Sequence, residues 1–174
     1  MQYEKAKYSY KEEEKSYFLH SGKGRFIMQA KDIMTQNLIT VGPETTIREM
    51  AEILVKNKIS GLPVVDDQGK VIGMVSEGDL MQTEIAPKLP DALSILGAII
   101  YYNGLREYKE AFRKVAATKA EEIMTDKVVA VQAEDDVSQV GQLMLDHNIK
   151  RVPVLDGTRL VGIISRSDMV KMLL

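Results

Sequence analysis

The chain has 174 residues, 45% of them hydrophobic and 28% charged, with a formal net charge of −2. This near-neutral balance is that of a globular protein and gives no electrostatic reason to expect nucleic acid or an anionic membrane as a partner. No cysteine is present, which excludes disulfides, a thiol nucleophile and thiolate metal ligands. The first residues are charged where a signal peptide would be apolar. The longest apolar run, 95–102, is far shorter than the roughly 20 residues of a membrane span. We therefore expect a soluble, cytoplasmic protein.

Residues 1–27 are predicted to be an N-terminal arm outside the folded part of the chain. They are rich in lysine, glutamate and tyrosine. This composition favours a mobile or weakly helical segment.

Residues 28–83 form the first of two similar units. A strand is predicted at 38–41, and the apolar residues between 47 and 55 then follow the spacing of one helix face. Thr46 and Glu49 stand at the two positions of a helix capping box, which satisfies the free amides of the first turn. This region therefore predicts a strand followed by an amphipathic helix.

The first unit continues with two short β-branched runs, 62–65 and 71–75, separated by an Asp/Gly turn. This pattern is typical of a β-hairpin. Asp79 follows the second run at the predicted N-cap of another helix. The unit as a whole is therefore predicted to be β-α-β-β-α.

Residues 84–119 are predicted to be a helical insert between the two units. Two apolar stripes at helical spacing indicate its helices: Leu93, Leu96, Ile99 and Ile100, and then Leu105, Tyr108, Phe112 and Val115. We expect the stripes to cover the core or a dimer partner.

Residues 120–174 repeat the first unit. The matching segments are DIMT (32–35) with EIMT (122–125), GLPVV (61–65) with RVPVL (151–155), and GMVSEGDL (73–80) with GIISRSDM (162–169). The predicted elements recur as a strand at 128–131, a helix after Asp136 with Gln139 in the capping position, strands at 152–155 and 160–164, and a helix at Asp168. The second copy is one residue shorter, and the deletion falls in the hairpin turn, where duplicated structures tolerate it.

The sequence thus predicts an α+β fold of two pseudo-symmetric β-α-β-β-α repeats packed sheet to sheet, with a helical insert between them. One such repeat is too small to bury both faces of its sheet. The two copies should therefore pack against each other.

The duplicated (D/E)IMT…PV…(S)xxD pattern resembles a tandem pair of CBS (cystathionine β-synthase) domains, which form a Bateman module. The resemblance covers Ala30–Met81 and Ala120–Leu174. It implies a pseudo-dimer with a cleft between the copies that binds AMP, ADP, ATP or S-adenosylmethionine as a regulatory ligand. The Asp that ends the (S/T)-x-x-D segment would hold the ribose, and a carboxylate is suited to accept hydrogen bonds from both vicinal hydroxyls.

The stronger candidate site is built around Asp168. Ser165 and Ser167 place two hydroxyls beside this carboxylate, and the basic pair Lys150 and Arg151 precedes a strand that should line the same cleft. An arginine can bind phosphate oxygens with two donors. By resemblance, residues of the other copy would enclose the adenine: Thr35, Ile39 and Ile59.

The weaker candidate site is built around Asp79. It keeps the hydroxyl of Ser76 but has Gly78 in place of the second serine. Ser60 and Gly61 stand in place of the basic pair, so Lys58 is left as the phosphate partner. By resemblance, its adenine would lie among Thr125, Val129 and Ile149.

Structural interpretations compete with these assignments. The two aspartates can serve as helix N-caps alone, the serines as turn residues, and the Lys150–Arg151 pair as a solvated dipeptide. No metal site and no catalytic constellation is predicted, so the chain is not expected to be an enzyme.

The leading hypothesis is an adenosine-nucleotide sensor that acts through a conformational change in a homodimer or on a partner protein. The alternative is an interaction or dimerisation scaffold with a vestigial nucleotide cleft. A hydrolase or transferase acting on the nucleotide is a third hypothesis, for which no base or nucleophile is in place.

Overall fold

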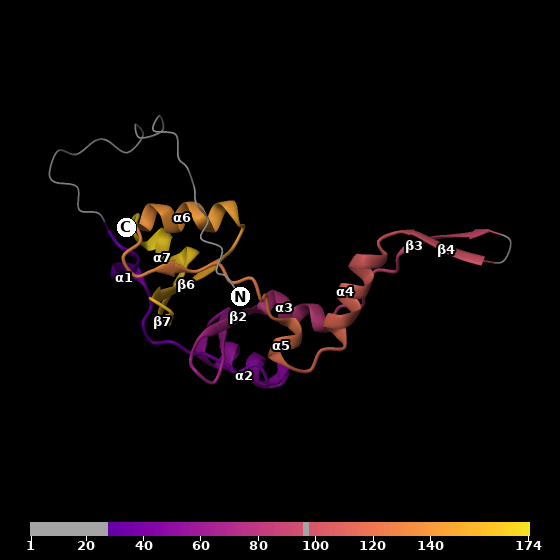
Figure 1. Ribbon diagram of the computed structural model, residues 1–174, viewed down its shortest axis with the longest axis horizontal. Helices are drawn as coiled ribbons and strands as arrows, with labels where there is room; N and C mark the ends of the chain where they lie inside the picture. Colours follow the sequence, from indigo (N-terminus) through magenta and orange to yellow (C-terminus); the bar gives the residue numbers. More distant parts are fainter. Residues whose placement is uncertain (1–27, 96–97) are drawn as a thin grey trace, which may run out of the picture.

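The computed structural model describes residues 28–95 and 98–174 (Figure 1). The predicted arm and Leu96 lie outside this range. The first half of the fold contains helix α2 (Ile47–Asn57), strands β1 (Gly61–Val65) and β2 (Val71–Ser76), and helix α3 (Glu77–Thr83). The second half repeats this order with α6 (Val137–Asp146), β6 (Arg151–Asp156), β7 (Arg159–Ser165) and α7 (Arg166–Lys171), and it begins with an additional short strand, β5 (Val131–Gln132). The remaining elements are the one-turn helices α1 (Ala30–Ile33) and α5 (Ala120–Ile123), and the insert elements β3 (Asp91–Ile95), β4 (Ala98–Asn103) and α4 (Leu105–Val115).

The two predicted hairpins are confirmed, with the same register in both halves. Pro63 lies opposite Met74 in the first hairpin, and Pro153 lies opposite Ile163 in the second. Each hairpin has a register irregularity at the same place, just after Val64 or Val154. The duplication therefore preserves the irregularities of the sheet as well as its strands.

The helices that precede the hairpins begin where the sequence predicts. Thr46 caps α2 through the predicted box, in which the Thr46 amide donates to Glu49 Oε2 at 2.9 Å. Asp136 caps α6 differently, because its carboxylate accepts from the amide of Ser138 at 2.8 Å rather than pairing with Gln139. Both helices turn an apolar face to the core, on which Met50 and Met144 are almost completely buried.

The predicted first strands of the two repeats are shorter than expected. Val41 alone bridges to Val64, and in the second half only β5 pairs with β6, in parallel. Thr35 is hydrogen bonded to Ile163 in the other half, so residues 36–40 span the distance between the halves. They therefore cannot run alongside β1, and the prediction of a full strand at 38–41 was wrong.

The two halves exchange their first helices. Helix α1 precedes the first half in sequence but packs on the second, where the Ala30 amide donates to the carbonyl of Asp135 at 2.8 Å. Helix α5 packs in turn on the first half, where the Ala120 amide donates to the carbonyl of Thr45 at 2.9 Å. Figure 1 shows the indigo α1 beside the yellow and orange elements of the second half. Each half therefore contains a helix that belongs, in sequence, to the other repeat.

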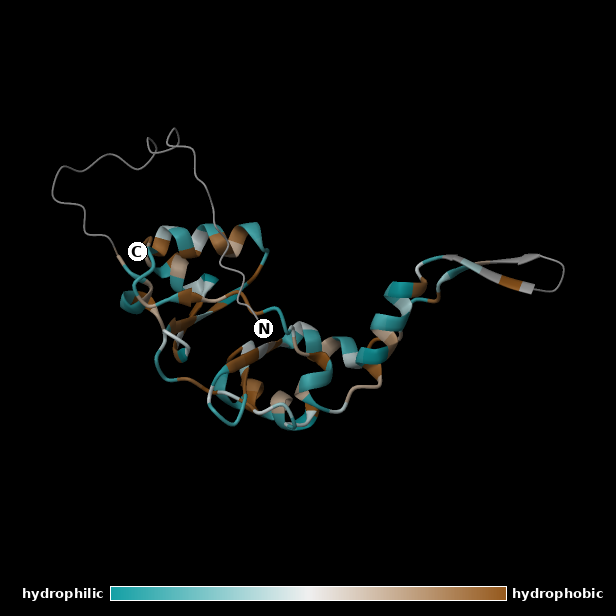
Figure 2. Ribbon diagram, in the orientation of Figure 1, coloured by the Kyte–Doolittle hydropathy of each residue, from teal (hydrophilic) through white to brown (hydrophobic). Residues whose placement is uncertain are grey.

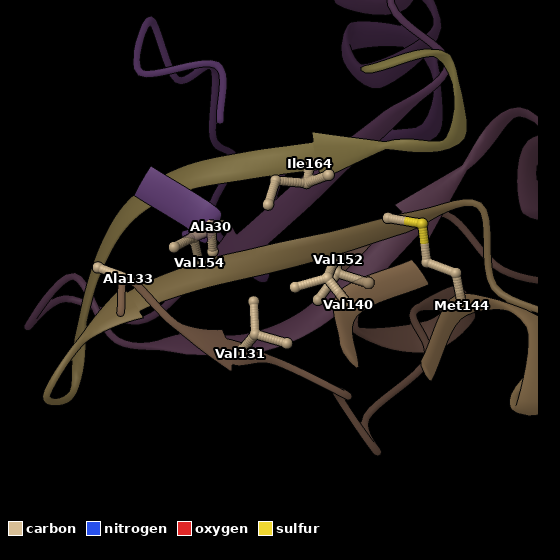
Figure 3. Packing of buried hydrophobic residues seen from close by; sticks show 8 residues of the cluster. All are labelled: Ala30, Val131, Ala133, Val140, Met144, Val152, Val154 and Ile164. Carbon is tan, nitrogen blue, oxygen red and sulfur yellow. The ribbon is translucent and has the colours of Figure 1, made fainter. Parts of the chain in front are cut away.

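Each half has its own hydrophobic core, completed by an exchanged helix. The core of the second half comprises Ala30, Val131, Ala133, Val140, Met144, Val152, Val154 and Ile164 (Figure 3). Ala30 is fully buried there among residues of β6 and β7. The core of the first half comprises Val41, Met50, Leu54, Leu62, Val64, Val75, Ala120 and Ile123. Neither core is complete without a segment that the sequence assigns to the other copy.

The insert corrects one prediction and confirms another. Its first apolar stripe, predicted as a helix, is an antiparallel hairpin in which Leu93 pairs with Ile100. The run Ile99–Tyr102 is β-branched and aromatic, which favours a strand over a helix. The second stripe is helical as predicted, and the rings of Tyr108 and Phe112 stack on α4 at 6.2 Å.

The insert projects away from the two halves (Figure 1). Figure 2 shows that α4 is mostly hydrophilic, whereas brown residues concentrate in the strands of the two halves. Within the ranges that the structure describes, every helix is too short or too polar to traverse a lipid bilayer.

Candidate functional site

Each hairpin delivers a Ser-x-x-Asp segment to the start of a short helix. Ser165 is the N-cap of α7, and Asp168 is the third residue of that helix. The prediction that Asp168 and Asp79 are themselves N-caps was therefore wrong, because the strand ends at the serine and the helix begins one residue later. The capping box still fixes the carboxylate, since Asp168 Oδ2 accepts from the Ser165 amide at 2.9 Å and from Ser165 Oγ at 2.6 Å.

The second carboxylate oxygen of Asp168 accepts a hydrogen bond from a lysine that is largely exposed to solvent. Asp168 Oδ1 accepts from Lys171 Nζ at 2.9 Å, and the Lys171 side chain is 72% exposed while that of Asp168 is 13% exposed. Burial alone would raise the pKa of Asp168, but hydrogen bonds from Ser165 and Lys171 and the charge of Lys171 bring it below its ordinary value. Asp168 is thus an ionised acceptor, rigidly placed, and within the described part of the chain one of its oxygens is covered by a single solvated lysine.

Asp79 has the same fixed geometry but a different second partner. Its Oδ2 accepts from the Ser76 amide at 3.0 Å and from Ser76 Oγ at 2.7 Å. Its Oδ1 accepts from Lys114 Nζ at 3.3 Å. Lys114 belongs to α4 of the insert, so this contact joins the insert to the first half. No feature of the repeat pattern pointed to Lys114.

The predicted threonines meet the strands that lead to the two aspartates. Thr35 exchanges two backbone hydrogen bonds with Ile163, two residues before Ser165. Thr125 does the same with Met74, two residues before Ser76. The structure therefore brings Thr35 to the Asp168 strand and Thr125 to the Asp79 strand, each from the other copy.

The predicted isoleucines lie at the edges of the cores. Ile39 and Ile59 are partly buried against the core of the first half, and Ile149 against that of the second. Val129 is partly buried as well. These residues therefore present apolar surface at the edges of the two halves.

The side chain of Arg151 reaches from the second half to the first. Its guanidinium packs on Gly61, the residue at the equivalent position of the first half, where a Cβ would stand 2.9 Å from Nη1. Burial lowers the pKa of Arg151, and the charge of Glu77 acts in the opposite direction. The arginine is therefore held between the halves, close to an acidic residue that the site prediction had not included.

The other predicted polar residues are at the surface. Lys150, Ser167 and Lys58 are exposed, and Lys58 ends α2 in the left-handed conformation with φ 54°. Lys58 and Ile59 line a hollow of about 380 Å³ together with Ala51, Leu54, Val55, Glu77 and Leu80. Neither predicted ribose-binding aspartate lines this hollow, so it lies beside the candidate sites rather than in them.

Arg166 is a further residue of the Asp168 site that the sequence did not reveal. Its Nε donates to the carbonyl of Ile149 at 2.9 Å, and its Nη2 to the carbonyl of Met144 at 3.3 Å and to Asn148 Oδ1 at 3.2 Å. These bonds fasten the start of α7 to the end of α6. The first half has Glu77 at the equivalent position, so this support exists on one side only.

Known proteins share both the sequence pattern and this fold. The family model of the CBS domain matches residues 30–85 and 120–174. An uncharacterized protein of Methanocaldococcus jannaschii, MJ1426, is 31% identical over 156 residues, which cover 85% of this chain and 92% of that protein. The chloroplastic CBS domain-containing protein CBSX2 of Arabidopsis thaliana is 28% identical over 145 residues, which cover 80% of this chain and 61% of that protein.

Two solved structures resemble this fold and contain adenosine compounds. The crystal structure of CBSX2 in complex with AMP matches with a TM-score of 0.69 and 29% identity, over 83% of this chain and 95% of that one. The CBS domain pair of protein MJ0100 in complex with 5′-methylthioadenosine and S-adenosyl-L-methionine matches with a TM-score of 0.63 and 29% identity, over 84% of this chain and 96% of that one. With both repeats matched in sequence and in fold, the chain belongs to the CBS domain family and carries a tandem pair of CBS domains.

Proposed function

We propose that this CBS pair is a regulatory module that binds one adenosine-type ligand, AMP, ADP, ATP or S-adenosylmethionine, at Asp168. The observation that supports the proposal is that the two oxygens of this carboxylate are held differently. Its Oδ2 is fixed by Ser165, whereas its Oδ1 accepts a hydrogen bond from the exposed Lys171. A ribose hydroxyl can take the place of such a solvated lysine at small cost.

The surroundings of Asp168 support the same ligand class. Thr35 reaches the adjacent strand from the other half, and Arg151 is a half-buried cation between the halves. A guanidinium suits the phosphate of a nucleotide, and the family resemblance assigns the flat base to the apolar surface of Ile39 and Ile59, which lie at the edge of the core of the first half. Solved relatives that hold AMP or S-adenosyl-L-methionine make this ligand class the one to test.

Isothermal titration with AMP, ATP and S-adenosylmethionine tests the proposal, with Asp168→Ala as the site variant. We expect the variant to lose about 10-fold to 150-fold in affinity, because a hydrogen bond to a charged group contributes about 1.5–3 kcal/mol. Asp136→Ala is the matched control, since it removes a helix cap of the same half away from the site and should leave the affinity unchanged. Binding weaker than about 1 mM for all three ligands would contradict the proposal.

The regulatory role requires that the ligand favours one arrangement of the protein over another. We propose that this arrangement is that of a homodimer formed by the helices of both halves. Exposed apolar residues recur there at equivalent positions: Val55 (79% exposed) with Leu145 (69%), and Met81 (62%) with Val170 (60%). A repeated apolar face of this kind is typical of an interaction surface.

The scaffold hypothesis is favoured by a different surface. Ile99, Tyr101 and Phe112 of the insert are each more than half exposed. These residues could bind a partner protein.

Light scattering of two variants distinguishes the nucleotide-sensing dimer from the scaffold. One is Val55→Asp/Leu145→Asp, and the other lacks residues 91–118. We expect the first variant to be monomeric and the second to remain dimeric. The opposite result, together with association that nucleotide does not change, would favour the scaffold.

The module is proposed to act without chemistry of its own. Incubation of the purified chain with ATP should release neither ADP nor phosphate. Release at a rate that follows the protein through purification would revive the hypothesis of a nucleotide hydrolase.

A further inference from the structure

The two equivalent aspartates differ in what covers their second carboxylate oxygen. Asp168 Oδ1 is covered by Lys171, three residues away on the same helix. Asp79 Oδ1 is covered by Lys114, which comes from the insert and is separated from it by 35 positions in the chain. The insert lies between the two repeats and belongs to neither. The two repeats therefore carry similar sites, and the insert gives Asp79 a lysine partner from outside the repeat.

The two ion pairs also differ in burial. The side chains of Lys114 and Asp79 are 28% and 15% exposed, whereas Lys171 is 72% exposed. An exposed ion pair exchanges readily with water and is screened by salt. A pair withdrawn from water is screened less, and a ligand that displaces Lys114 must also leave a partly buried ammonium without its partner. Asp79 is thus a much poorer acceptor for a ribose than Asp168.

Position 77 also differs between the two halves. Glu77 stands in the first turn of α3, where the second half has the cationic Arg166. The Arg166 guanidinium is bonded to the end of α6, whereas the charge of Glu77 acts on Arg151, so the two charges do not occupy equivalent places in the two halves. The difference between the two aspartates as ligand acceptors is therefore carried by Lys114.

We propose that Lys114 is the residue that decides which of the two sites takes the ligand. It keeps Asp79 engaged in an internal ion pair, so that the module binds one adenosine-type ligand per chain, and the same pair holds α4 of the insert against the first half. This inference deepens the proposed function and rests on it for the ligand, but the attachment of the insert can be tested without any ligand.

The ligand arm of the test uses AMP titration with Lys114→Met, which keeps the apolar part of the side chain and removes its charge. We expect wild type to bind one AMP per chain and Lys114→Met to bind two, the second more weakly. In the Asp168→Ala background, where AMP should bind at least about tenfold more weakly, Lys114→Met should add one site. Lys109→Met, a charge removal on an exposed position of the same helix, is the control and should leave the stoichiometry at one. If Lys114→Met and its combination with Asp168→Ala gain no site, the role in selection is overturned.

The ligand-free arm measures amide hydrogen exchange across α4. Asp79→Asn and Lys114→Met should each speed the exchange of the α4 amides by about threefold or more, because the ion pair no longer holds the helix in place. Asp168→Asn, the equivalent change in the other half, should leave α4 unchanged. Equal exchange in Asp79→Asn and Asp168→Asn would overturn the attachment. A wild-type chain that binds no nucleotide would instead overturn the proposed function and the selection with it, while faster exchange in Asp79→Asn would still support the attachment.

Discussion

The sulfur of Met34 lies against Gly162, in the space that a side chain at residue 162 would occupy: a Cβ there would stand 2.3 Å from Met34 Sδ. The equivalent contact in the other half joins Met124 and Gly73, with the same distance of 2.3 Å. In both cases the methionine follows an exchanged helix and the glycine belongs to the strand that receives it. These two contacts secure the interlocking of the halves.

Gly162→Ala and Gly73→Ala should therefore each destabilise the protein. Overpacking of a close contact costs about 1–3 kcal/mol, and the thioether must move to relieve it. Urea unfolding measures the loss. Gly42→Ala is the matched control, because a Cβ at Gly42 meets no atom within 4 Å, and it should change the free energy of unfolding by less than about 0.5 kcal/mol. An effect of Gly162→Ala no larger than that of Gly42→Ala would contradict the contact.

The repeat pattern predicted most of the fold but could not predict the exchange. Met34 and Met124 stand at equivalent positions, as do Gly73 and Gly162. Because both copies contain the same methionine and the same glycine, the sequence is equally compatible with each methionine packing on its own copy or on the other copy. Whether the methionines pack on their own copy depends on the path of residues 36–40 between the halves. Local sequence pattern does not determine this path.

The candidate site was predicted in part for a similar reason. The Ser165–Asp168 segment follows from the repeat, and the family resemblance placed Thr35 of the other copy near Asp168; in the structure Thr35 pairs with Ile163 of the strand that leads to Ser165. The Lys114–Asp79 pair does not follow from the repeat, because Lys114 lies in α4 of the insert, outside both repeats, and no local pattern indicates that this helix packs on the first half. A local signal did exist for Arg151, since glycine at the equivalent position 61 leaves room for a long side chain.

Arg151→Ala should separate the phosphate from the nucleoside part of recognition. If the guanidinium binds phosphate, AMP affinity should fall by about tenfold or more while adenosine affinity stays unchanged. Gly61→Ala should have a smaller effect in the same direction, because a Cβ at 2.9–3.1 Å from the guanidinium would push it aside. Titration of both ligands measures the ratio. An equal loss for AMP and adenosine in Arg151→Ala would assign the arginine to packing between the halves.

Stability should depend on pH through Asp168. Its pKa in the folded protein is lower than the ordinary value of 3.8, so the folded state favours the ionised carboxylate. The contribution of this group to stability is therefore fully present above the ordinary pKa and is lost as the pH falls through the folded pKa. The difference in free energy of unfolding between wild type and Asp168→Asn should stay constant from about pH 7 to about pH 5 and shrink below about pH 4. The subtraction cancels other carboxylates such as Glu49, whose pKa is also lowered by Thr46. A difference that grows on acidification would contradict the assignment.

Arg166→Ala should weaken both the second half and the site that it supports. Three hydrogen bonds from its guanidinium join the start of α7 to the end of α6, and their removal should lower the free energy of unfolding by about 1–3 kcal/mol. Because the guanidinium touches helix ends, we expect AMP affinity to fall through looser placement of Asp168, with faster amide exchange in α7 as the sign of that route. Glu77→Ala changes the equivalent residue of the first half, whose carboxylate cannot donate to carbonyl oxygens, and should cost little stability. If Arg166→Ala lowers the affinity while α7 exchanges at the wild-type rate, Arg166 contacts the ligand directly, and its positioning role is wrong.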